Sequence, residues 1–370
     1  MSSHNEHPLL AQTTKLLQAL VRTPSVSGQE GATAAILTAW LQQKGAIVRN
    51  LGNNVIACGA HYNPNQPTLI LNSHHDTVKA NTSYTKSAYD ANIRDGKLYG
   101  LGSTDAGGAL CCLASVFVGL LHAPLPFNLV YIASAEEETS GKGGLELVIN
   151  SLTDLDLRAD MAIVGEPTSM EVAVAQKGLI VLDCVNVGQA GHAARNNGQN
   201  ALYAALEDIM AVRNLVWDRT SSWLGRTLCQ TTMIKAGTAH NQVPDRCEWV
   251  IDVRPNECYE LQEIVEIIQS VVSAEVKPRS LRLRPKSIDL GHPLVLAAKA
   301  VGGTVYGSPT MSDWTFMPCP AIKIGPGDTL RSHTANEYIL IEELNTGLNR
   351  YQSLILKLAE LTPTASIHNA

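Results

Sequence analysis

The sequence predicts an α/β protein, in which a mostly parallel sheet is flanked by helices and a smaller α+β domain is inserted into the larger one. Three observations lead to this prediction. Short, nearly continuous apolar runs alternate with helical runs, as in sheets that are covered on both faces. Between about residues 178 and 287 the runs become longer and alternate polar with apolar residues. The length of 370 residues also exceeds what one hydrophobic core usually sustains.

The N-terminal part is predicted to begin with two helices. Apolar residues at helical spacing mark the first helix over Leu9–Val21, and Thr23-Pro24 ends it. We interpret Ser27 and Glu30 as a capping box that starts the second helix, and Gly45 as the residue that ends it.

The strands of the main sheet are predicted where short runs are almost entirely apolar. A longer apolar run, Ala109–Leu121, is predicted to be a buried helix between them. The predicted strands are Asn54–Cys58, Thr68–Asn72, Asn128–Ala133, Met161–Val164 and Ala321–Ile324.

The inserted domain is predicted over residues 178–287, which leaves residues 1–177 and 288–370 for the larger domain. Alternating runs and amphipathic helices of this size are typical of a small α+β unit. The runs are Ile180–Val187 and Glu248–Val253, and the helices lie near Ala201–Leu215 and Leu261–Ser273.

The composition excludes several classes of protein. Hydrophobic residues make up 45% and charged residues 17%, which is a globular balance. A net charge of −6 offers no basic surface, so nucleic acid is not an expected partner. The run Ala109–Leu121 is too short to cross a bilayer, and Met1–Leu10 lacks the features of a secretory signal, so we expect a cytoplasmic protein without a membrane partner. The eight cysteines have no CxxC spacing, and we expect reduced thiols.

Residues that can bind metal or move protons follow the predicted strands and open the apolar helix. The carboxyl ends of strands in such sheets meet at one edge, so these residues are expected to converge. Imidazoles with carboxylates suit Zn²⁺, Co²⁺ or Mn²⁺. Each signal alone has an ordinary explanation as a loop residue, but five coincidences favour a metal centre. The residues are His74–Asp76, Asp105 in the turn Gly102–Gly108, Glu136–Glu138, Glu166 and His333.

Five motifs, in this order and spacing, resemble those of the acetylornithine deacetylase and succinyl-diaminopimelate desuccinylase family of dinuclear zinc amidohydrolases. The resemblance extends from near Leu9 to the C-terminal helix. It implies a catalytic, metal-binding domain of residues 1–177 and 288–370 and an inserted dimerisation domain of residues 178–287. The motifs are Ser-His-x-Asp at Ser73–Asp76, Gly-x-x-Asp at Gly102–Asp105, the acidic Glu136–Glu138, Gly-Glu-Pro-Thr at Gly165–Thr168 and Ser-His-Thr-Ala-Asn-Glu at Ser332–Glu337.

The resemblance implies two divalent metal ions, with Zn²⁺ first and Co²⁺ or Mn²⁺ as alternatives. His74 and Glu166 would bind one ion, Glu138 and His333 would bind the other, and Asp105 would bridge the two.

The resemblance also implies which residues carry out the reaction. Glu137 would be the general base, which takes a proton from the attacking water and later gives it to the departing amine. Asp76 would orient the imidazole of His74. His75 occupies the variable position of the motif and is not assigned to metal.

Further substrate-binding residues are implied, mostly in the inserted domain. His192 would reach into the active site of the neighbouring subunit of a homodimer and help to stabilise the oxyanion, although a His that caps local backbone is the simpler alternative. Asn241, Arg254 and Gly325 would help to hold the substrate. Arg254 is a natural bidentate partner for an α-carboxylate, and a pair with Asp252 is the alternative.

One position departs from the family pattern. Relatives often have Lys two residues after the bridging Asp, whereas this chain has Gly107 there. The change removes a cation beside the expected metal site and marks a subgroup.

The reaction that the resemblance implies is hydrolysis of the N-acyl amide of a small amino acid, first of all N-acetylornithine in arginine biosynthesis. N-acetylcitrulline and the N-succinyl derivatives of ornithine or citrulline would fit the same site. Desuccinylation of succinyl-diaminopimelate and dipeptide hydrolysis are the enzymatic alternatives. A binding protein that keeps the fold is the non-enzymatic alternative, and the presence of Glu137 beside a full ligand set argues against it.

Overall fold

The computed structural model describes residues 6–195 and 197–362 of the chain, which form two compact units. Residues 175–177 and 307–311, predicted for the larger domain, group with the second unit instead. These segments bind each other, since the N–H of Lys177 donates to the carbonyl oxygen of Ser308 (3.1 Å). The first unit consists of Met1–Val174, Ile288–Tyr306 and Ser312–Ala370, and the second of Ala175–Ser287 and Gly307–Met311.

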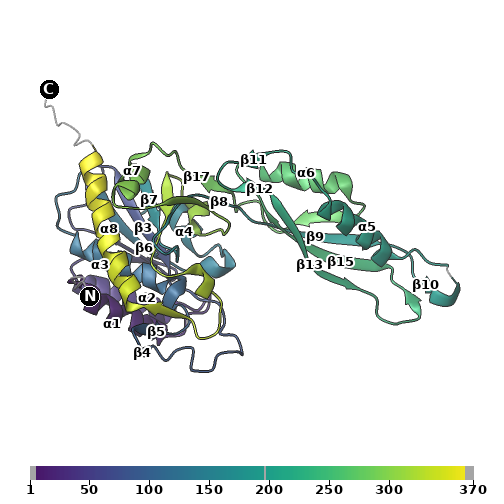
Figure 1. Ribbon diagram of the computed structural model, residues 1–370, viewed down its shortest axis with the longest axis horizontal. Coiled ribbons are helices and arrows are strands. Elements are labelled where there is room, and N and C mark those ends of the chain that lie inside the picture. The colour runs from purple at the N-terminus through teal and green to yellow at the C-terminus, as the bar shows by residue number, and fades with distance from the viewer. Residues whose placement is uncertain (1–5, 196, 363–370) are drawn as a thin grey trace. The chain divides into compact units, whose positions relative to one another are not determined.

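Strands of a nine-stranded sheet form the centre of the first unit (Figure 1). Its strand order is β1-β2-β6-β3-β7-β19-β8-β17, and β18 pairs with β8. The four central strands, β6, β3, β7 and β19, are parallel to their neighbours in that group. The strands are β1 (Ile47–Leu51), β2 (Asn54–Cys58), β3 (Thr68–His74), β6 (Asn128–Ser134), β7 (Met161–Val164), β8 (Val172–Gln176), β17 (Lys286–Ser287), β18 (Val305–Ser308) and β19 (Ala321–Lys323).

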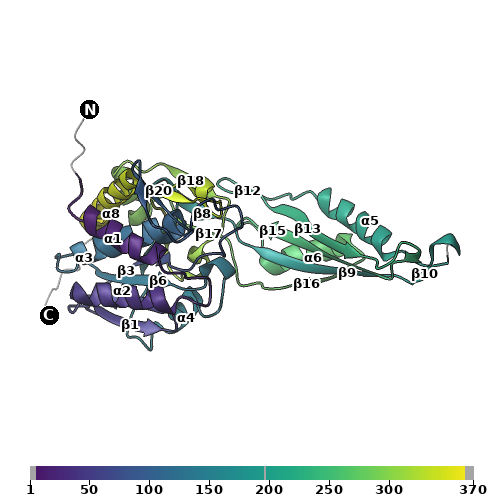
Figure 2. The same ribbon diagram turned by 90° about the horizontal axis from the view of Figure 1, so that it is seen from below.

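Helices flank this sheet, which confirms the predicted fold class. In Figure 2, α1, α3 and α8 lie on one side of β3 and β6, and α2 and α4 lie on the other. Strands β3, β6 and β7 are buried along their whole length, as their continuous apolar runs predict. The helices are α1 (Leu10–Val21), α2 (Gly31–Gln43), α3 (Ala109–Gly119), α4 (Leu145–Asn150), α7 (Pro293–Ala300) and α8 (Ile341–Leu361).

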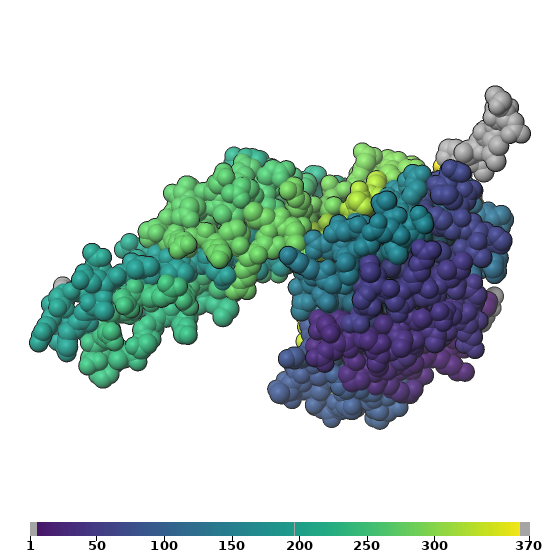
Figure 3. Space-filling model, turned by 180° about the vertical axis from the view of Figure 1, so that it is seen from behind, coloured from purple at the N-terminus to yellow at the C-terminus, as the bar shows by residue number. Residues whose placement is uncertain are grey.

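The N-terminal helices and the segments after them form a large part of the surface of the first unit, purple and blue in Figure 3. A small antiparallel sheet of β4 (Ile93–Arg94), β5 (Lys97–Tyr99) and β20 (Tyr338–Leu340) belongs to the same unit. Strand β20 brings the segment after His333 beside the turn that carries Asp105, because the N–H of Gly100 donates to the carbonyl oxygen of Glu337 (2.9 Å).

The predicted capping box at the start of α2 is wrong. The helix begins at Gly31 with Glu30 as its N-cap, and no side chain there caps a backbone N–H of the first turn. The hydroxyl of Ser27 donates to Asp76 (2.7 Å), and the carboxylate of Glu30 accepts the N–H groups of Gly28 and Glu136. Ser27 and Glu30 therefore bind Asp76 and Glu136, which belong to distant loops, in place of the first turn of the helix.

The second unit is a four-stranded antiparallel sheet against which two helices pack. Burial alternates along β9 and β15, so that one face of the sheet meets the helices in a core around Trp249. Strand β13 lies at one edge of the sheet, in the order β13-β15-β9-β16. The elements are β9 (Ile180–Val187), β13 (Leu228–Ala236), β15 (Arg246–Arg254), β16 (Glu275–Pro278), α5 (Ala201–Arg213) and α6 (Leu261–Val271), with short pairs β10 (Gly191–His192) with β14 (Gln242–Val243) and β11 (Thr220–Ser221) with β12 (Gly225–Arg226).

Within residues 6–195 and 197–362, no helix combines the length and apolar character needed to cross a membrane. All eight cysteines are free thiols.

Candidate metal centre and active site

The predicted ligands lie where strands of the main sheet end. Strand β3 ends at His74, the turn Glu137–Thr139 follows β6, and Glu166 lies two residues beyond β7. Asp105 belongs to the turn Ser103–Gly108 that opens α3, where its own backbone is extended (φ −110°, ψ 99°). His333 follows β19 and has a left-handed backbone (φ 58°). Strand direction and local turns thus bring these side chains to one place.

The structure brings all five predicted ligands together. Donor atoms of His74, Asp105 and Glu138 lie within 4.8 Å of one another. His74 Nε2 is 3.2 Å from Asp105 Oδ1 and 4.0 Å from Glu166 Oε1. His333 Nε2 is 3.0 Å from Glu138 Oε2 and 3.5 Å from Asp105 Oδ2. Asp105 therefore stands between a His74–Glu166 group and a His333–Glu138 group, as a bridging ligand would.

The imidazole of His74 is oriented so that one nitrogen faces the other ligands. Nδ1–H donates to the carbonyl oxygen of Asp76 (3.0 Å), and the Asp76 carboxylate lies 3.4 Å from the same nitrogen. Nε2 therefore points towards Asp105. A ligand His whose other nitrogen is held by a carboxylate or carbonyl is the usual arrangement at metal sites.

The charges at the site are those of a crowded carboxylate cluster. Burial, with a smaller contribution from Asp105, raises the pKa of Glu166 to about 8. Burial and the nearby carboxylates of Glu166 and Asp313 raise the pKa of Glu137 well above its usual range. The hydrogen bond to Glu138 raises the pKa of His333 to about 9. Carboxylates packed this closely need positive counter-charge, and the donor set fits a pair of divalent cations.

Glu337 holds the turn that carries Asp105. Its carboxylate, 1% exposed, accepts the N–H groups of Gly102 (3.0 Å), Thr104 (2.7 Å) and Asp105 (3.0 Å). The hydroxyl of Ser332 donates to the Asp105 carboxylate. The sequence motif includes both residues, but their hydrogen bonds to the turn at Asp105 appear only in the fold.

Two buried ionisable residues at the site have no assigned role in the sequence prediction. Asp313 is 2% exposed and accepts a hydrogen bond from Ser134, and burial raises its pKa to about 6. Lys323 is also 2% exposed, and burial lowers its pKa to about 8, against the opposing influence of Glu166 and Glu137. A Lys inside the apolar run Ala321–Ile324 is the signal that could have found it. Lys323 therefore supplies a cation near Glu166, Glu137 and Asp105.

Packing explains two glycines of the site. A Cβ at Gly107 would lie 2.4 Å from the carbonyl oxygen of Gly102, so this turn has no room for a side chain at that position. A Cβ at Gly325 would lie 2.5 Å from the carbonyl oxygen of Glu166. The N–H of Gly325 donates to the Thr168 hydroxyl (3.0 Å), and its carbonyl accepts the Thr168 N–H (3.1 Å). Gly325 thus holds the loop after Glu166, besides any contact with substrate.

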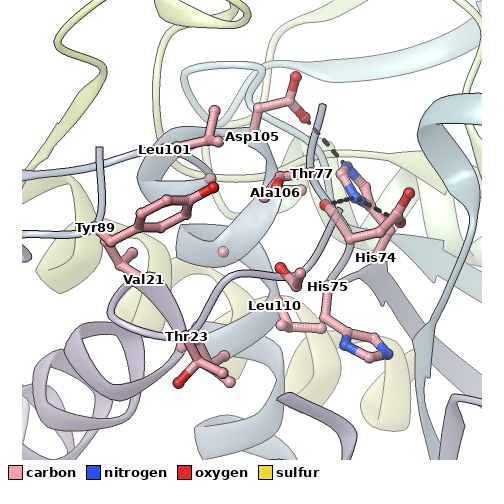
Figure 4. A pocket seen from close by; sticks show the side chains of 15 residues that line it. Val21, Thr23, His74, His75, Thr77, Tyr89, Leu101, Asp105, Ala106 and Leu110 are labelled. Carbon is pink, nitrogen blue, oxygen red and sulfur yellow. Dashed lines mark hydrogen bonds and ion pairs between the residues drawn. The ribbon is translucent and has the colours of Figure 1, made fainter. Parts of the chain in front are cut away.

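A pocket adjoins the ligands on the side of α1 (Figure 4). His74, Asp76 and Asp105 contribute polar atoms to it, and its apolar lining includes Val21 and Leu110. Figure 4 shows the hydrogen bond that joins His74 to Asp105 at the pocket. His75 points away from the ligands, since its ring nitrogens contact Thr33 (2.9 Å) and the carbonyl oxygen of Asn53 (3.0 Å).

The remaining predicted site residues belong to the second unit. His192 is exposed, and its Nδ1 accepts the N–H of Ala194 (3.2 Å). Asn241 is exposed and directly precedes β14, the strand that pairs with β10. Its backbone carbonyl accepts the N–H of Ala193 (3.0 Å).

Arg254 forms the ion pair that was its alternative explanation. Its Nε and Nη2 donate to the two oxygens of Asp252 (2.7 and 2.9 Å). The Arg254 side chain remains 34% exposed, so a further carboxylate has access to it.

Residues 70–357 match the model of peptidase family M20/M25/M40, and the chain belongs to this family. Its members are hydrolases that act on amide bonds with a dinuclear metal centre. The protein is therefore a metal-dependent amide hydrolase, and the resemblance inferred from the motifs is confirmed.

Two relatives illustrate the range of names in the family. The chain is 27% identical over 365 residues to the acetylornithine deacetylase of Yersinia pseudotuberculosis serotype O:1b (strain IP 31758), covering 88% of this chain and 92% of the relative. It is 26% identical over 357 residues to succinyl-diaminopimelate desuccinylase 2 of Ruegeria sp. (strain TM1040), covering 88% and 90%.

Solved structures share the fold. Aminopeptidase PepT from Bacillus cereus ATCC 10987 has a TM-score of 0.76 at 19% identity, covering 95% of this chain and 99% of that one. The Bacillus subtilis YXEP protein, a dinuclear metal binding peptidase of the M20 family, has a TM-score of 0.72 at 16% identity, covering 96% and 99%.

Proposed function

We propose that the protein hydrolyses the N-acyl amide of a small amino acid, with N-acetylornithine as the first substrate and ornithine and acetate as products, in arginine biosynthesis. The observation that carries the proposal is the convergence of His74, Asp105 and Glu138 with Glu137 beside them. The similarity to an acetylornithine deacetylase supports this choice of substrate. We also propose a location in the cytoplasm, which the eight free thiols support.

The ligand assignment follows the two groups around Asp105. His74 and Glu166 would hold one ion, His333 and Glu138 the other, and Asp105 both, with Zn²⁺ proposed first and Co²⁺ or Mn²⁺ next. When bound, two such ions would polarise the amide carbonyl and acidify water at the site.

Proton transfer is assigned to Glu137. Its carboxylate takes a proton from the attacking water and gives it to the departing amine. The backbone carbonyl oxygen of Asp76 accepts the Nδ1–H of His74 (3.0 Å), and its carboxylate accepts the backbone N–H of Glu137 (3.0 Å). One residue therefore positions both a proposed ligand and the base.

The test of the proposal is a turnover screen of the metal-loaded enzyme. N-acetyl and N-succinyl derivatives of ornithine, citrulline, lysine and diaminopimelate are assayed for release of a free α-amine, together with dipeptides. We expect the highest kcat/KM for N-acetylornithine. A preference for N-acetylcitrulline, for a succinyl derivative or for a dipeptide would contradict that substrate while leaving amide hydrolysis intact.

Arg254→Ala is expected to raise KM at least about tenfold with little change in stability, because a hydrogen-bonded charge to the substrate α-carboxylate is lost. Arg246→Ala is the matched control, since Arg246 pairs with Glu248 on the same strand at the same spacing. Both variants are compared by steady-state kinetics and thermal unfolding. An unchanged KM with a large fall in Tm would show that Arg254 only pairs with Asp252.

A homodimer is proposed through the second unit. Tyr203, Leu206 and Met210 are spaced along one face of α5 and are 65%, 47% and 47% exposed. The edge strand β13 exposes Met233 and Ile234 (64% and 48%). An apolar helix face together with an unpaired sheet edge favours association with a second copy of the same surface.

If His192 acts in the partner's site, two inactive variants are expected to complement each other. Glu137→Ala and His192→Ala homodimers should both be nearly inactive, whereas a mixed dimer contains one intact site. Random co-assembly should then recover roughly a quarter of the wild-type activity, measured on co-expressed, differently tagged chains. Activity of the mixture no higher than that of the separate homodimers would contradict a shared site.

A further inference from the structure

Three consecutive backbone N–H groups in the loop that carries Glu137 are bound by two buried carboxylates. The N–H of Glu136 donates to Glu30 Oε1 (3.2 Å), and those of Glu137 and Glu138 donate to Asp76 Oδ1 (3.0 Å) and Oδ2 (3.1 Å). Glu30 and Asp76 are 0% and 1% exposed. The backbone of the base is therefore held from the protein interior, residue by residue.

Both carboxylates are connected to one turn, Ser27–Glu30. The hydroxyl of Ser27 donates to Asp76 Oδ2 (2.7 Å), and the N–H of Gly28 donates to Glu30 Oε1 (2.5 Å). Glu30 Oε2 accepts a hydrogen bond from Asn53 (2.7 Å). The contacts with Gly28 and Asn53 hold Glu30 at the start of α2. The additional bond to Glu136 connects this turn to the active site.

The backbone of Glu136 needs such a restraint. Its φ of 55° lies in the left-handed region, which disfavours a residue with a Cβ. Three other bonds hold it: the N–H of Gly141 (2.8 Å) and the hydroxyl of Thr139 (3.3 Å) donate to its carbonyl, and the N–H of Gly143 donates to its side chain (3.0 Å). Because Glu137 follows directly, a rotation of the backbone at Glu136 moves the carboxylate of the base.

We propose that Glu30 is a positioning residue that acts through Glu136 to hold the carboxylate of Glu137 where it meets the attacking water. The inference rests on the proposed role of Glu137 as general base. If Glu30 has this role, loss of its carboxylate lowers kcat and changes KM and metal content little. Displacing the base by about 1 Å slows proton transfer, on the order of a hundredfold in unfavourable cases, but removes no contact with the substrate.

The first test compares Glu30→Ala and Glu30→Gln in the metal-loaded enzyme. We expect Glu30→Ala to lower kcat by about 10- to 100-fold and Glu30→Gln to retain most of the activity, because the amide oxygen still accepts the N–H of Glu136. Asp160→Ala is the control: Asp160 also accepts a backbone N–H, that of Thr68 (2.9 Å), at the far end of β3. It should leave kcat unchanged. Equal kcat for Glu30→Ala and wild type would overturn the proposal.

The second test separates positioning from general destabilisation. In a Glu137→Gln background, Glu30→Ala should change kcat by less than about threefold, because the group through which it acts is already lost. An equal loss in both backgrounds would overturn the proposal. If Glu30→Ala does not fold, Glu30→Asp enters the same cycle, since its shorter side chain withdraws from Glu136. Full activity of Glu137→Gln alone would instead contradict the proposed function.

Discussion

Exhaustive dialysis against a chelator is expected to abolish amide hydrolysis, and full activity is expected to return only after two equivalents of Zn²⁺ per chain. The reason is the arrangement of the five proposed ligands in two groups that share Asp105. An ion held by only one of these groups would place positive charge on one side of the Asp105 carboxylate and none on the other. The measurement is metal content by elemental analysis together with kcat, as metal is added back to the apoprotein.

Dialysis against chelator already saturated with Zn²⁺ is the control, and it should leave activity intact. Full activity at one equivalent, or activity that is indifferent to chelation, would contradict an essential pair of ions. His74→Ala should lose the ion proposed to lie between His74 and Glu166, and His333→Ala the ion proposed to lie between His333 and Glu138, which would separate the two groups.

Glu137→Gln is expected to lower kcat by about two to four orders of magnitude while metal content stays near normal, the usual contribution of a positioned general base. Glu137 lies beside the ligand Glu138, and its backbone is held by Asp76. Steady-state kinetics on equally metal-loaded proteins make the comparison.

The neighbouring Glu136→Gln is the matched control within the acidic triplet. The Glu136 carboxylate accepts the N–H of Gly143 and lies against Gly141, so its loss of charge should cost far less rate. If Glu137→Gln lost metal and Glu138→Gln retained it, the roles of these two residues would be reversed.

The parts of the fold that follow from local pattern could be predicted from the sequence. Strands β2 and β7 have the predicted bounds, because continuous apolar runs between polar turns leave few alternatives for a strand buried on both faces. The convergence of His74, Asp105 and Glu138 also follows from strand order, since groups at the carboxyl ends of neighbouring strands must meet.

The contacts that cross between distant loops could not be predicted. Ser27 and Glu30 have the spacing of a capping box, yet they bind residues 49 and 106 positions away along the chain. Their partners depend on how β3 and β6 place the following loops, and no local pattern contains that information. The place of Lys323 in the site could not be predicted for a related reason. The apolar run around it predicts that the strand is buried, but not which carboxylates surround the buried ammonium group.

The most direct test of metal-assisted water attack on an amide is hydrolysis of N-acetylornithine in H₂¹⁸O by the metal-loaded enzyme. Mass spectrometry of the products should show one ¹⁸O atom in the released acetate and an unlabelled ornithine with a free α-amine. The apoprotein should release neither product. Acetate without label, or no release from any acyl amino acid or dipeptide while two metal ions are bound, would contradict the account.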